Sequence, residues 1–183
     1  MDELIDILNE DGSPTGKTEL KSVAHANGLF HSTIHLWCYS LDGCLLLQQR
    51  GKSKETYPLK WDVSVAGHIG AGESPEISVF RECQEEIGIT IETENLKKIT
   101  VYKKEKKHNN GIFDREYVHV FIYELDKSIA LTKQESEVES LVWISIKDFE
   151  SWITQKHEGL IPGSEKRFEF VISEIQKRLI SSS

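Results

Sequence analysis

The alternation of apolar and polar residues predicts short strands separated by turns. Apolar residues at 4–8, followed by the turn pair Asp11-Gly12, predict a first hairpin. The apolar runs 31–40 and 44–47, joined by Leu41-Asp42-Gly43, predict a second hairpin. Further strands are predicted over 61–66, 96–102, 117–125 and 140–144.

Helices are predicted at four places. A short helix is expected near 20–26, and two more near 147–153 and 164–179. Between them, Ser74-Pro75-Glu76 provide an N-cap hydroxyl, a proline at the first helical position and an early carboxylate, and Gly88 follows as the C′ residue. Strands interspersed with a few helices, without regular βαβ alternation, predict a mixed α/β (α+β) layer fold rather than a doubly wound sheet.

The helix that begins at Ser74 has two different faces. Three carboxylates, from Glu82, Glu85 and Glu86, crowd within about one turn, and Arg81 lies one turn before Glu85. Such crowding is unfavourable by itself, and a divalent cation would relieve the repulsion. The alternative is an ordinary solvated helix surface. The opposite face carries apolar residues at spacings of three and four, which predicts packing against a core: Ile77, Phe80, Cys83 and Ile87.

The composition excludes several classes of protein. The 183 residues predict one domain, and the net charge of -8 gives no overall attraction to a nucleic-acid polymer or to an anionic membrane. Because residues 1–6 contain neither a basic region nor a long apolar stretch, we expect no secretory signal, no membrane span and a cytoplasmic location. Three cysteines at irregular spacing are expected to be free thiols: Cys38, Cys44 and Cys83.

The spacing of glycines and charged residues around this helix resembles the Nudix box. That motif reads G-x5-E-x7-R-E-U-x-E-E-x-G-U, with U apolar. Gly67, Glu73 and the run Arg81–Ile89 match each fixed glycine and charged position, a coincidence expected on the order of once in 10^8 starting positions. The one departure is Cys83 at a U position.

The resemblance implies a fold, a cofactor and a set of site residues. The fold is an α/β/α sandwich with a mixed sheet, in a single domain over 1–183 with an N-terminal hairpin extension at about 1–28, the box at 67–89 and a C-terminal helix at about 164–180. Glu82 and Glu86 would be the principal ligands of Mg2+ or Mn2+, with Glu85 either as a further ligand or as a group that contacts the ligands from outside. Gly67 would let the strand end pass close to the metal, where the Ala66 carbonyl could be a ligand.

The resemblance implies roles for three further residues. Arg81 would orient Glu85, and Glu73 would tie down the loop before the helix. Glu137, in a later acidic segment, would complete the metal site or act as the base, with plain solvent exposure as the alternative. The base itself stays open between the helix glutamates and this later loop.

Softer matches resemble the branch of the superfamily that includes isopentenyl diphosphate isomerase. His31 and His68 align with metal ligands of the isomerase, and they either line the site or are ordinary hydrogen-bonded histidines. The first isomerase histidine aligns with Ala24, one place from His25. The catalytic cysteine of the isomerase aligns with Ala66, so the group that would transfer a proton to carbon is missing and isomerase activity is not expected.

Three functions stay under consideration. The first is metal-dependent hydrolysis of a diphosphate linkage in a small molecule, a nucleoside diphosphate derivative or a nucleotide. The others are an isomerase-like reaction and a catalytically silent nucleotide-binding module. The basic run Lys103–Lys107 is either a solvated hairpin tip or a phosphate-binding segment folded over the cleft. The family also makes a homodimer plausible.

Overall fold

The computed structural model describes residues 2–181, and its centre is a mixed sheet of seven strands. Five strands follow one another in the order β5-β4-β3-β8-β7, while β6 pairs with β3 and β9 pairs with β4. The pairing of β3 with β8 is parallel, and the other pairings are antiparallel. The strands are β3 (His31–Tyr39), β4 (Cys44–Arg50), β5 (Trp61–Asp62), β6 (Val65–His68), β7 (Lys97–Lys107), β8 (Phe113–Glu124) and β9 (Val138–Ser145).

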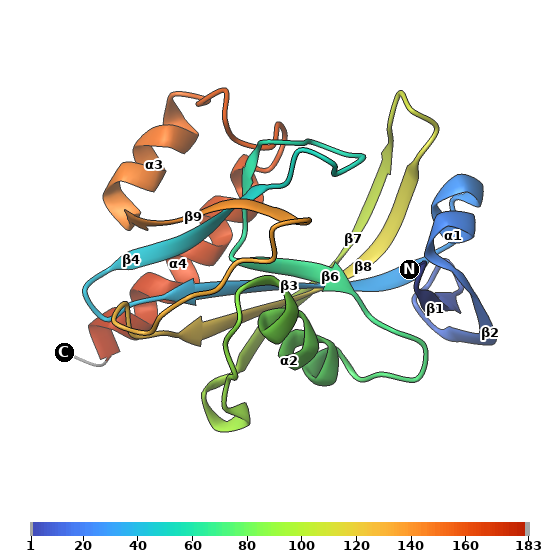
Figure 1. Ribbon diagram of the computed structural model, residues 1–183, viewed down its shortest axis with the longest axis horizontal. Helices are drawn as coiled ribbons and strands as arrows, with labels where there is room; N and C mark the ends of the chain where they lie inside the picture. Colours follow the sequence, from blue (N-terminus) through green and yellow to red (C-terminus); the bar gives the residue numbers. More distant parts are fainter. Residues whose placement is uncertain (1, 182–183) are drawn as a thin grey trace.

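Helices cover both faces of this sheet (Figure 1). Helix α2 (Pro75–Glu86) packs on one face, where its Val79 and Cys83 join a core with Ile34 and Leu36 of β3. Helices α3 (Ile146–Thr154) and α4 (Glu165–Ser181) cover the other face around Trp37. Because strand side chains alternate between faces, β3 serves both cores. The α/β/α sandwich expected from the sequence is confirmed.

The N-terminal segment forms a small unit beside the sheet (Figure 1). Strands β1 (Leu4–Leu8) and β2 (Pro14–Leu20) pair as a separate two-stranded sheet, and helix α1 (Lys21–Asn27) follows. The unit has its own small core of Ile5, Ile7 and Ala24. It is joined to the main body by backbone hydrogen bonds, including Leu8 N–H to Phe30 O at 2.7 Å.

The strands differ from the sequence prediction in three places. In the second hairpin, the register of β3 with β4 contains a single pair of residues, Tyr39 and Leu45. Beyond that pair, β3 lies between β6 and β8, and β4 pairs with β9. The single strand predicted over 61–66 is divided into β5 and β6. Strands β7 and β8 are longer than predicted, so the basic run Lys103–Lys107 lies within β7 and not at a hairpin tip.

One packing prediction for α2 is wrong. Ile77 is 52% exposed, whereas Cys83 and Ile87 are fully buried. Glu82 and Glu86 are also buried, because α2 turns this edge toward β6 instead of toward solvent.

A 3-10 turn (Thr93–Asn95) leads from the segment after α2 into β7. Among residues 2–181, none of the helices combines the length and the apolar character that crossing a bilayer requires.

Candidate active site

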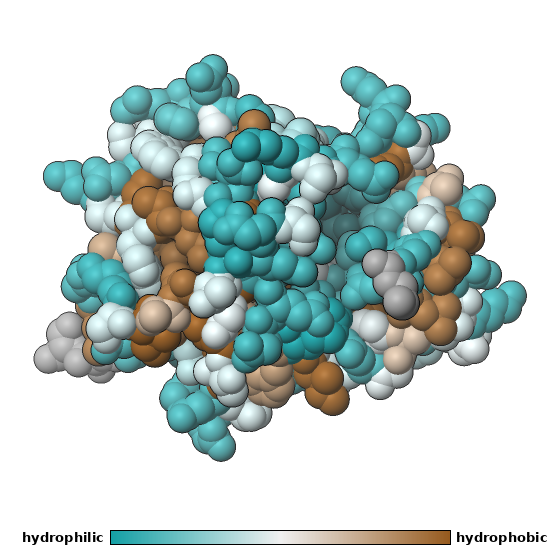
Figure 2. All heavy atoms as spheres, in the orientation of Figure 1, coloured by the Kyte–Doolittle hydropathy of each residue, from teal (hydrophilic) through white to brown (hydrophobic). Residues whose placement is uncertain are grey.

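A cavity of about 700 Å³ opens between the sheet, the β7–β8 hairpin and the N-terminal unit. Figure 2 shows the hollow, with hydrophilic residues around its mouth. Its lining includes Glu82 and Glu85 from α2, His68 from β6, Lys104 from β7 and Lys54 from the loop after β4. The cavity therefore brings together residues that are far apart in the sequence.

The start and end of helix α2 follow the residues that predicted them. The Ser74 hydroxyl accepts a hydrogen bond from Ile77 N–H at 3.3 Å, and Pro75 occupies the first helical position. Ile87 is the C-cap, and Gly88 follows with φ +72°. A left-handed φ strongly favours glycine, so the helix ends here and Glu86 lies in its last turn.

The two principal carboxylates lie buried against strand β6. Glu82 is 7% exposed and Glu86 1%. One oxygen of Glu86 accepts hydrogen bonds from Gln48 Nε2 at 2.9 Å and from Ala66 N–H at 3.3 Å. A Cβ placed on Gly67 would lie 2.1 Å from the Glu82 carboxyl carbon. Only a residue without a side chain allows this close approach of strand and helix.

Burial makes this pair of carboxylates electrostatically costly. Desolvation and the neighbouring Glu86 raise the pKa of Glu82 to about 8. Desolvation also raises the pKa of Glu86 to about 7, although Lys54 and Gln48 act in the opposite direction. Two buried like charges need a compensating cation, because low-polarity surroundings strengthen their repulsion. The arrangement therefore fits a divalent cation bound at these oxygens.

Arg81 contacts four carboxylates and the end of strand β6. Its Nη1 lies 2.8 Å from Glu82, and 3.4 Å from both Glu85 and Glu3. Its Nη2 donates to the His68 carbonyl at 2.9 Å and to Glu73 at 3.2 Å. The contact with Glu82 is shorter than the predicted one with Glu85, so Arg81 holds the helix and the strand together around Glu82.

Glu73 is the anchor of the loop before α2. Its Oε2 accepts hydrogen bonds from Gly70 N–H at 3.2 Å and from the Ser78 hydroxyl at 2.6 Å, besides the contact with Arg81. These contacts oppose the raising effect of burial and lower its pKa. The geometry matches the role in loop positioning that the resemblance implied.

Glu137 reaches the cavity from the segment before β9. It forms an ion pair with Lys54, whose Nζ also lies 4.0 Å from Glu86. Lys54 therefore connects the later acidic segment to the carboxylates of α2. Burial by itself raises the pKa of Glu137, but this contact outweighs it and lowers the pKa.

Three histidines and a glutamate form a second cluster beside the carboxylates. One ligand atom from each of His25, His31, His68 and Glu116 lies within 4.8 Å of the others. The Nε2 atoms of His25 and His68 are 3.0 Å apart. His31 Nε2 is buried and has no hydrogen-bond partner among the described residues. An unsatisfied buried nitrogen beside two further imidazoles fits a metal site.

The protonation states support the same interpretation. Burial lowers the pKa of His31 and holds that of His68 well below its usual value, which favours neutral imidazoles. A metal ligand must be the neutral form. Asp114 lies 3.2 Å from His25 Nδ1 and 2.9 Å from His108 Nε2. A carboxylate on the outer nitrogen of a histidine is a common orienting contact at metal sites.

Sequence reasoning missed part of this cluster and placed one of its members incorrectly. It aligned the first isomerase histidine with Ala24, which is buried in the N-terminal core, whereas His25 contributes the side chain. Asp114 and Glu116 were not singled out. Their alternation in strand β8 was an available signal, because residues two apart point to the same face.

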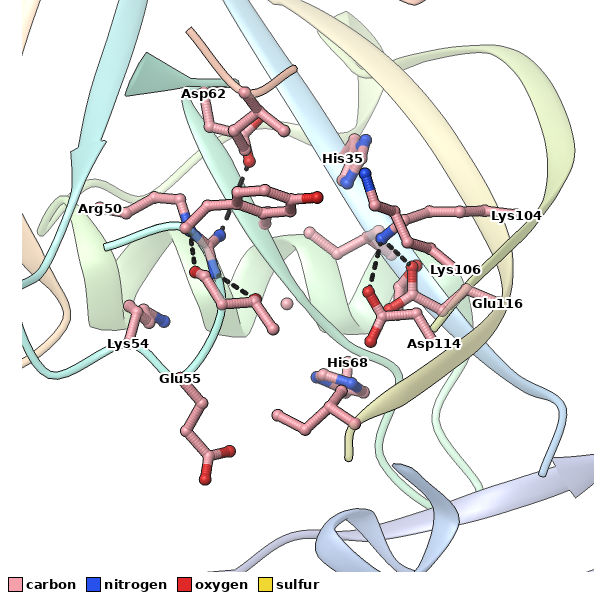
Figure 3. Close-up of a pocket in the computed structure, with 18 of the residues that line it drawn as sticks. His35, Arg50, Lys54, Glu55, Asp62, His68, Lys104, Lys106, Asp114 and Glu116 are labelled. Carbon is pink, nitrogen blue, oxygen red and sulfur yellow. Dashed lines mark hydrogen bonds and ion pairs between the residues drawn. The ribbon is translucent and has the colours of Figure 1, made fainter. Parts of the chain in front are cut away.

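The basic run of β7 lines the cavity through Lys103–Lys106, although only Lys104 in the run is partly buried and its other residues are exposed. Lys104 Nζ lies 2.8 Å from Glu116 and 3.1 Å from Asp114, as Figure 3 illustrates. Lys106 lines the same cavity. Lys104 is thus partly neutralised by the carboxylates that surround the histidine cluster, and these ion pairs connect the basic run to that cluster.

Comparison with known proteins identifies the family. The NUDIX domain family matches residues 29–163. Over 163 residues the chain is 37% identical to an uncharacterized Nudix hydrolase of Clostridium acetobutylicum, covering 87% of this chain and 78% of the relative. It is 31% identical to the isopentenyl-diphosphate Delta-isomerase of Shigella boydii over 146 residues, covering 80% and 79%.

Two further similarities bear on the extent of the match. Nudix hydrolase 3 of Arabidopsis thaliana is 30% identical over 166 residues, which cover 88% of this chain but only 22% of that protein. The crystal structure of a Deinococcus radiodurans protein superposes with a TM-score of 0.72 at 17% identity, covering 91% of this chain and 98% of the other. The sequence matches, the shared fold and the carboxylate helix agree, and the chain belongs to the Nudix family.

Proposed function

We propose that this protein is a divalent-metal-dependent hydrolase that cleaves a phosphoanhydride bond in a nucleoside diphosphate derivative or a nucleotide. The observation that carries the proposal is the buried pair Glu82 and Glu86 at the wall of a polar cavity. Glu82 and Glu86 would hold Mg2+ or Mn2+, with Glu85 and the Ala66 carbonyl as further oxygen ligands. When bound, the ion supplies Lewis acidity toward a phosphate oxygen.

The protein side chains around these ligands have separate roles in this proposal. Arg81 keeps Glu82 in place through its contacts with the strand and the loop. Lys54 and Arg50 line the cavity and attract the phosphates. Glu137, held by Lys54, is the candidate base outside α2 that could accept a proton from the attacking water.

The histidine cluster is the basis for a second metal centre. Three imidazoles and one carboxylate suit a transition-metal ion, Zn2+ before Mn2+, better than Mg2+, which prefers oxygen ligands. The two centres share one cavity, since His25, His68, Glu116 and Glu82 all line it.

A second candidate function is isomerisation of a prenyl diphosphate. It is favoured by the histidine cluster and by the similarity to isopentenyl-diphosphate Delta-isomerase. It is opposed by Ala66, whose methyl group cannot transfer a proton to carbon. A catalytically silent module could hold a cation at the same buried carboxylate pair, so phosphate release is the measurement that distinguishes it from a hydrolase.

Phosphate release over a panel of nucleotides, nucleotide sugars and prenyl diphosphates tests the proposal. In the presence of Mg2+ or Mn2+, Glu82→Gln and Glu86→Gln are each expected to lower kcat roughly 100-fold or more. Glu76→Gln, in the first turn of the same helix, is the matched control and should keep its activity. Full activity in both site variants, or proton exchange into isopentenyl diphosphate without hydrolysis, would contradict the proposal.

A further inference from the structure

One wall of the cavity carries a charged network of which the proposed phosphate chemistry uses only Arg50. Arg167 of α4 donates from Nη2 to Asp62 of β5 at 2.9 Å. His35 Nδ1 lies 3.4 Å from both Arg167 Nη1 and Tyr102 Oη. Arg50 Nη1 lies 3.6 Å from the other oxygen of Asp62. All of these residues line the cavity, and His35 and Asp62 lie on the side opposite His68 in Figure 3.

The network is buried but not fully satisfied. Asp62 is 6% and His35 7% exposed. The Nε of Arg167 and the Oγ1 of Thr33, which lines the same cavity, are buried without a hydrogen-bond partner among residues 2–181. Buried polar atoms normally have partners, so these two atoms, on residues that line one cavity, leave hydrogen-bonding capacity that a ligand could fill.

The charge states define what kind of ligand fits. Burial would raise the pKa of Asp62, but Arg167 and Arg50 outweigh it, so the carboxylate stays charged. Burial and Arg167 hold the pKa of His35 well below its usual value, so the ring is neutral. Arg50 also donates to the carbonyl and the hydroxyl of Thr56 at 3.1 and 3.3 Å, so the donor left in excess is Nε of Arg167. A hydrocarbon placed against these groups would leave them unpaired, whereas a group rich in hydrogen-bond acceptors would pair with them.

The network lies further along strand β3 than the histidine cluster and directly opposite Ala66 of β6, next to the carboxylate site. His31, Thr33 and His35 point to the same side of β3, because alternate residues of a strand share a face. Four residues of strand separate His31 of the histidine cluster from His35, or about 13 Å at roughly 3.3 Å per residue. A ligand with its phosphates at the metal sites could place a second polar part against the network, at the His35 end of the row His31, Thr33 and His35.

We propose that His35, Asp62 and Arg167, together with Thr33, form a specificity site that binds the nucleoside part of the substrate and disfavours a prenyl chain. The inference rests on the proposed function, because the same diphosphate occupies the metal end of the cavity. It adds the residues that distinguish a nucleoside diphosphate from other diphosphates. In this arrangement the acceptor atoms of base and ribose pair with Arg167 and Thr33.

Equilibrium binding separates this site from the catalytic step. With Mg2+ present, the affinity of the full-length protein for α,β-methylene-ADP and α,β-methylene-UDP is compared with its affinity for methylenediphosphonate. The last compound carries the diphosphate mimic without a nucleoside. At least one nucleotide analogue is expected to bind about tenfold or more tightly than methylenediphosphonate, which corresponds to about 1.4 kcal/mol.

Substitutions then test whether the network causes this difference in affinity between nucleotide analogues and methylenediphosphonate. His35→Ala and Thr33→Val are expected to reduce the nucleoside advantage by fivefold or more and to leave methylenediphosphonate binding within twofold of wild type. His119→Ala is the control, because His119 is a partly buried histidine of β8 that does not line the cavity. A folding defect would lower the affinity for both ligand types together.

The outcomes also separate this inference from the proposed function. Equal affinity for the nucleotide analogues and methylenediphosphonate, or equal losses for both ligand types in His35→Ala and Thr33→Val, would overturn the specificity site. Tighter binding of isopentenyl diphosphate than of the nucleotide analogues would overturn it as well. If the analogues bind as expected but no member of the substrate panel is hydrolysed, the proposed hydrolysis fails while the nucleoside site stands.

Discussion

At the scale of single residues, Gly67 is where the packing of the site is tightest. The strand and the helix approach so closely here that the Glu82 carboxyl group occupies the space of an absent side chain. The side chain of Glu82 is in turn held by Arg81 at 2.8 Å, so it has little freedom to move away. The glycine therefore controls the position of a proposed metal ligand without contacting the metal itself.

Gly67→Ala is expected to displace Glu82 and to lower kcat roughly 100-fold while the protein stays folded. The added methyl group would lie 2.1 Å from the Glu82 carboxyl carbon, a distance that forces the side chain to move. Steady-state kinetics and a thermal melt check the two parts of the prediction. Gly16→Ala is the control for kcat. Its φ of +74° makes the substitution strained and should lower the Tm, but no atom lies within 4 Å of the added Cβ and kcat should stay unchanged. Unchanged kcat in Gly67→Ala would mean that Glu82 is not needed in its present position.

The sequence predicted the carboxylate site better than the histidine cluster, for a physical reason. Glu82, Glu85 and Glu86 lie on one helix, so the period of the helix places them together before any tertiary contact forms. The histidine cluster joins α1, β3, β6 and β8, and no local pattern relates these four elements. His25 in particular depends on how the N-terminal unit docks, which is decided by long-range packing.

At the scale of secondary structure, α2 begins and ends where its cap residues indicate. The expected start at Ser74 and the expected stop at Gly88 are both confirmed. Capping depends on residues within one turn, so local sequence is enough to predict it. The division of residues 61–66 into two strands had no such local signal. It arises because β5 pairs with β4 while β6 pairs with β3.

Ser74→Ala is expected to lower the free energy of unfolding by about 1 kcal/mol, because the N–H of Ile77 loses its acceptor. For a chain of this size the loss corresponds to a Tm lower by about 2–4 °C. Urea unfolding measures the difference directly. Ser74→Asp, which restores an N-cap acceptor, should retain the wild-type stability. Equal losses in both variants would show that the hydroxyl does not act as a cap.

At the scale of the whole molecule, the N-terminal unit and the main body share the cavity. The unit contributes His25 to the histidine cluster, and Glu3 and Lys21 to the cavity wall. Backbone hydrogen bonds attach it to the loop before α2, among them Ala71 N–H to Leu4 O at 2.9 Å. Asp6 accepts from Gly72 N–H at 2.9 Å. The homodimer expected from the family stays a prediction.

This architecture predicts that a metal ion at the histidine cluster couples the unit to the sheet. A ligand that binds only the folded protein stabilises it by about 2.7 kcal/mol at a concentration of 100 Kd. Saturating Mn2+ is therefore expected to raise the Tm of the wild type by about 5–10 °C. It should also slow hydrogen exchange across residues 4–27, because these amides then open only when the cluster releases the metal.

His25→Ala distinguishes coupling through the cluster from a general effect of the metal. In this variant Mn2+ can still bind at Glu82 and Glu86, so part of the Tm increase should remain, but residues 4–27 should gain no exchange protection. Glu86→Gln is the complementary variant, and it should keep the protection of residues 4–27. Equal protection of residues 4–27 by Mn2+ in wild type and in His25→Ala would mean that this histidine does not connect the unit to the metal. The position of His25 in the cluster would then reflect packing alone.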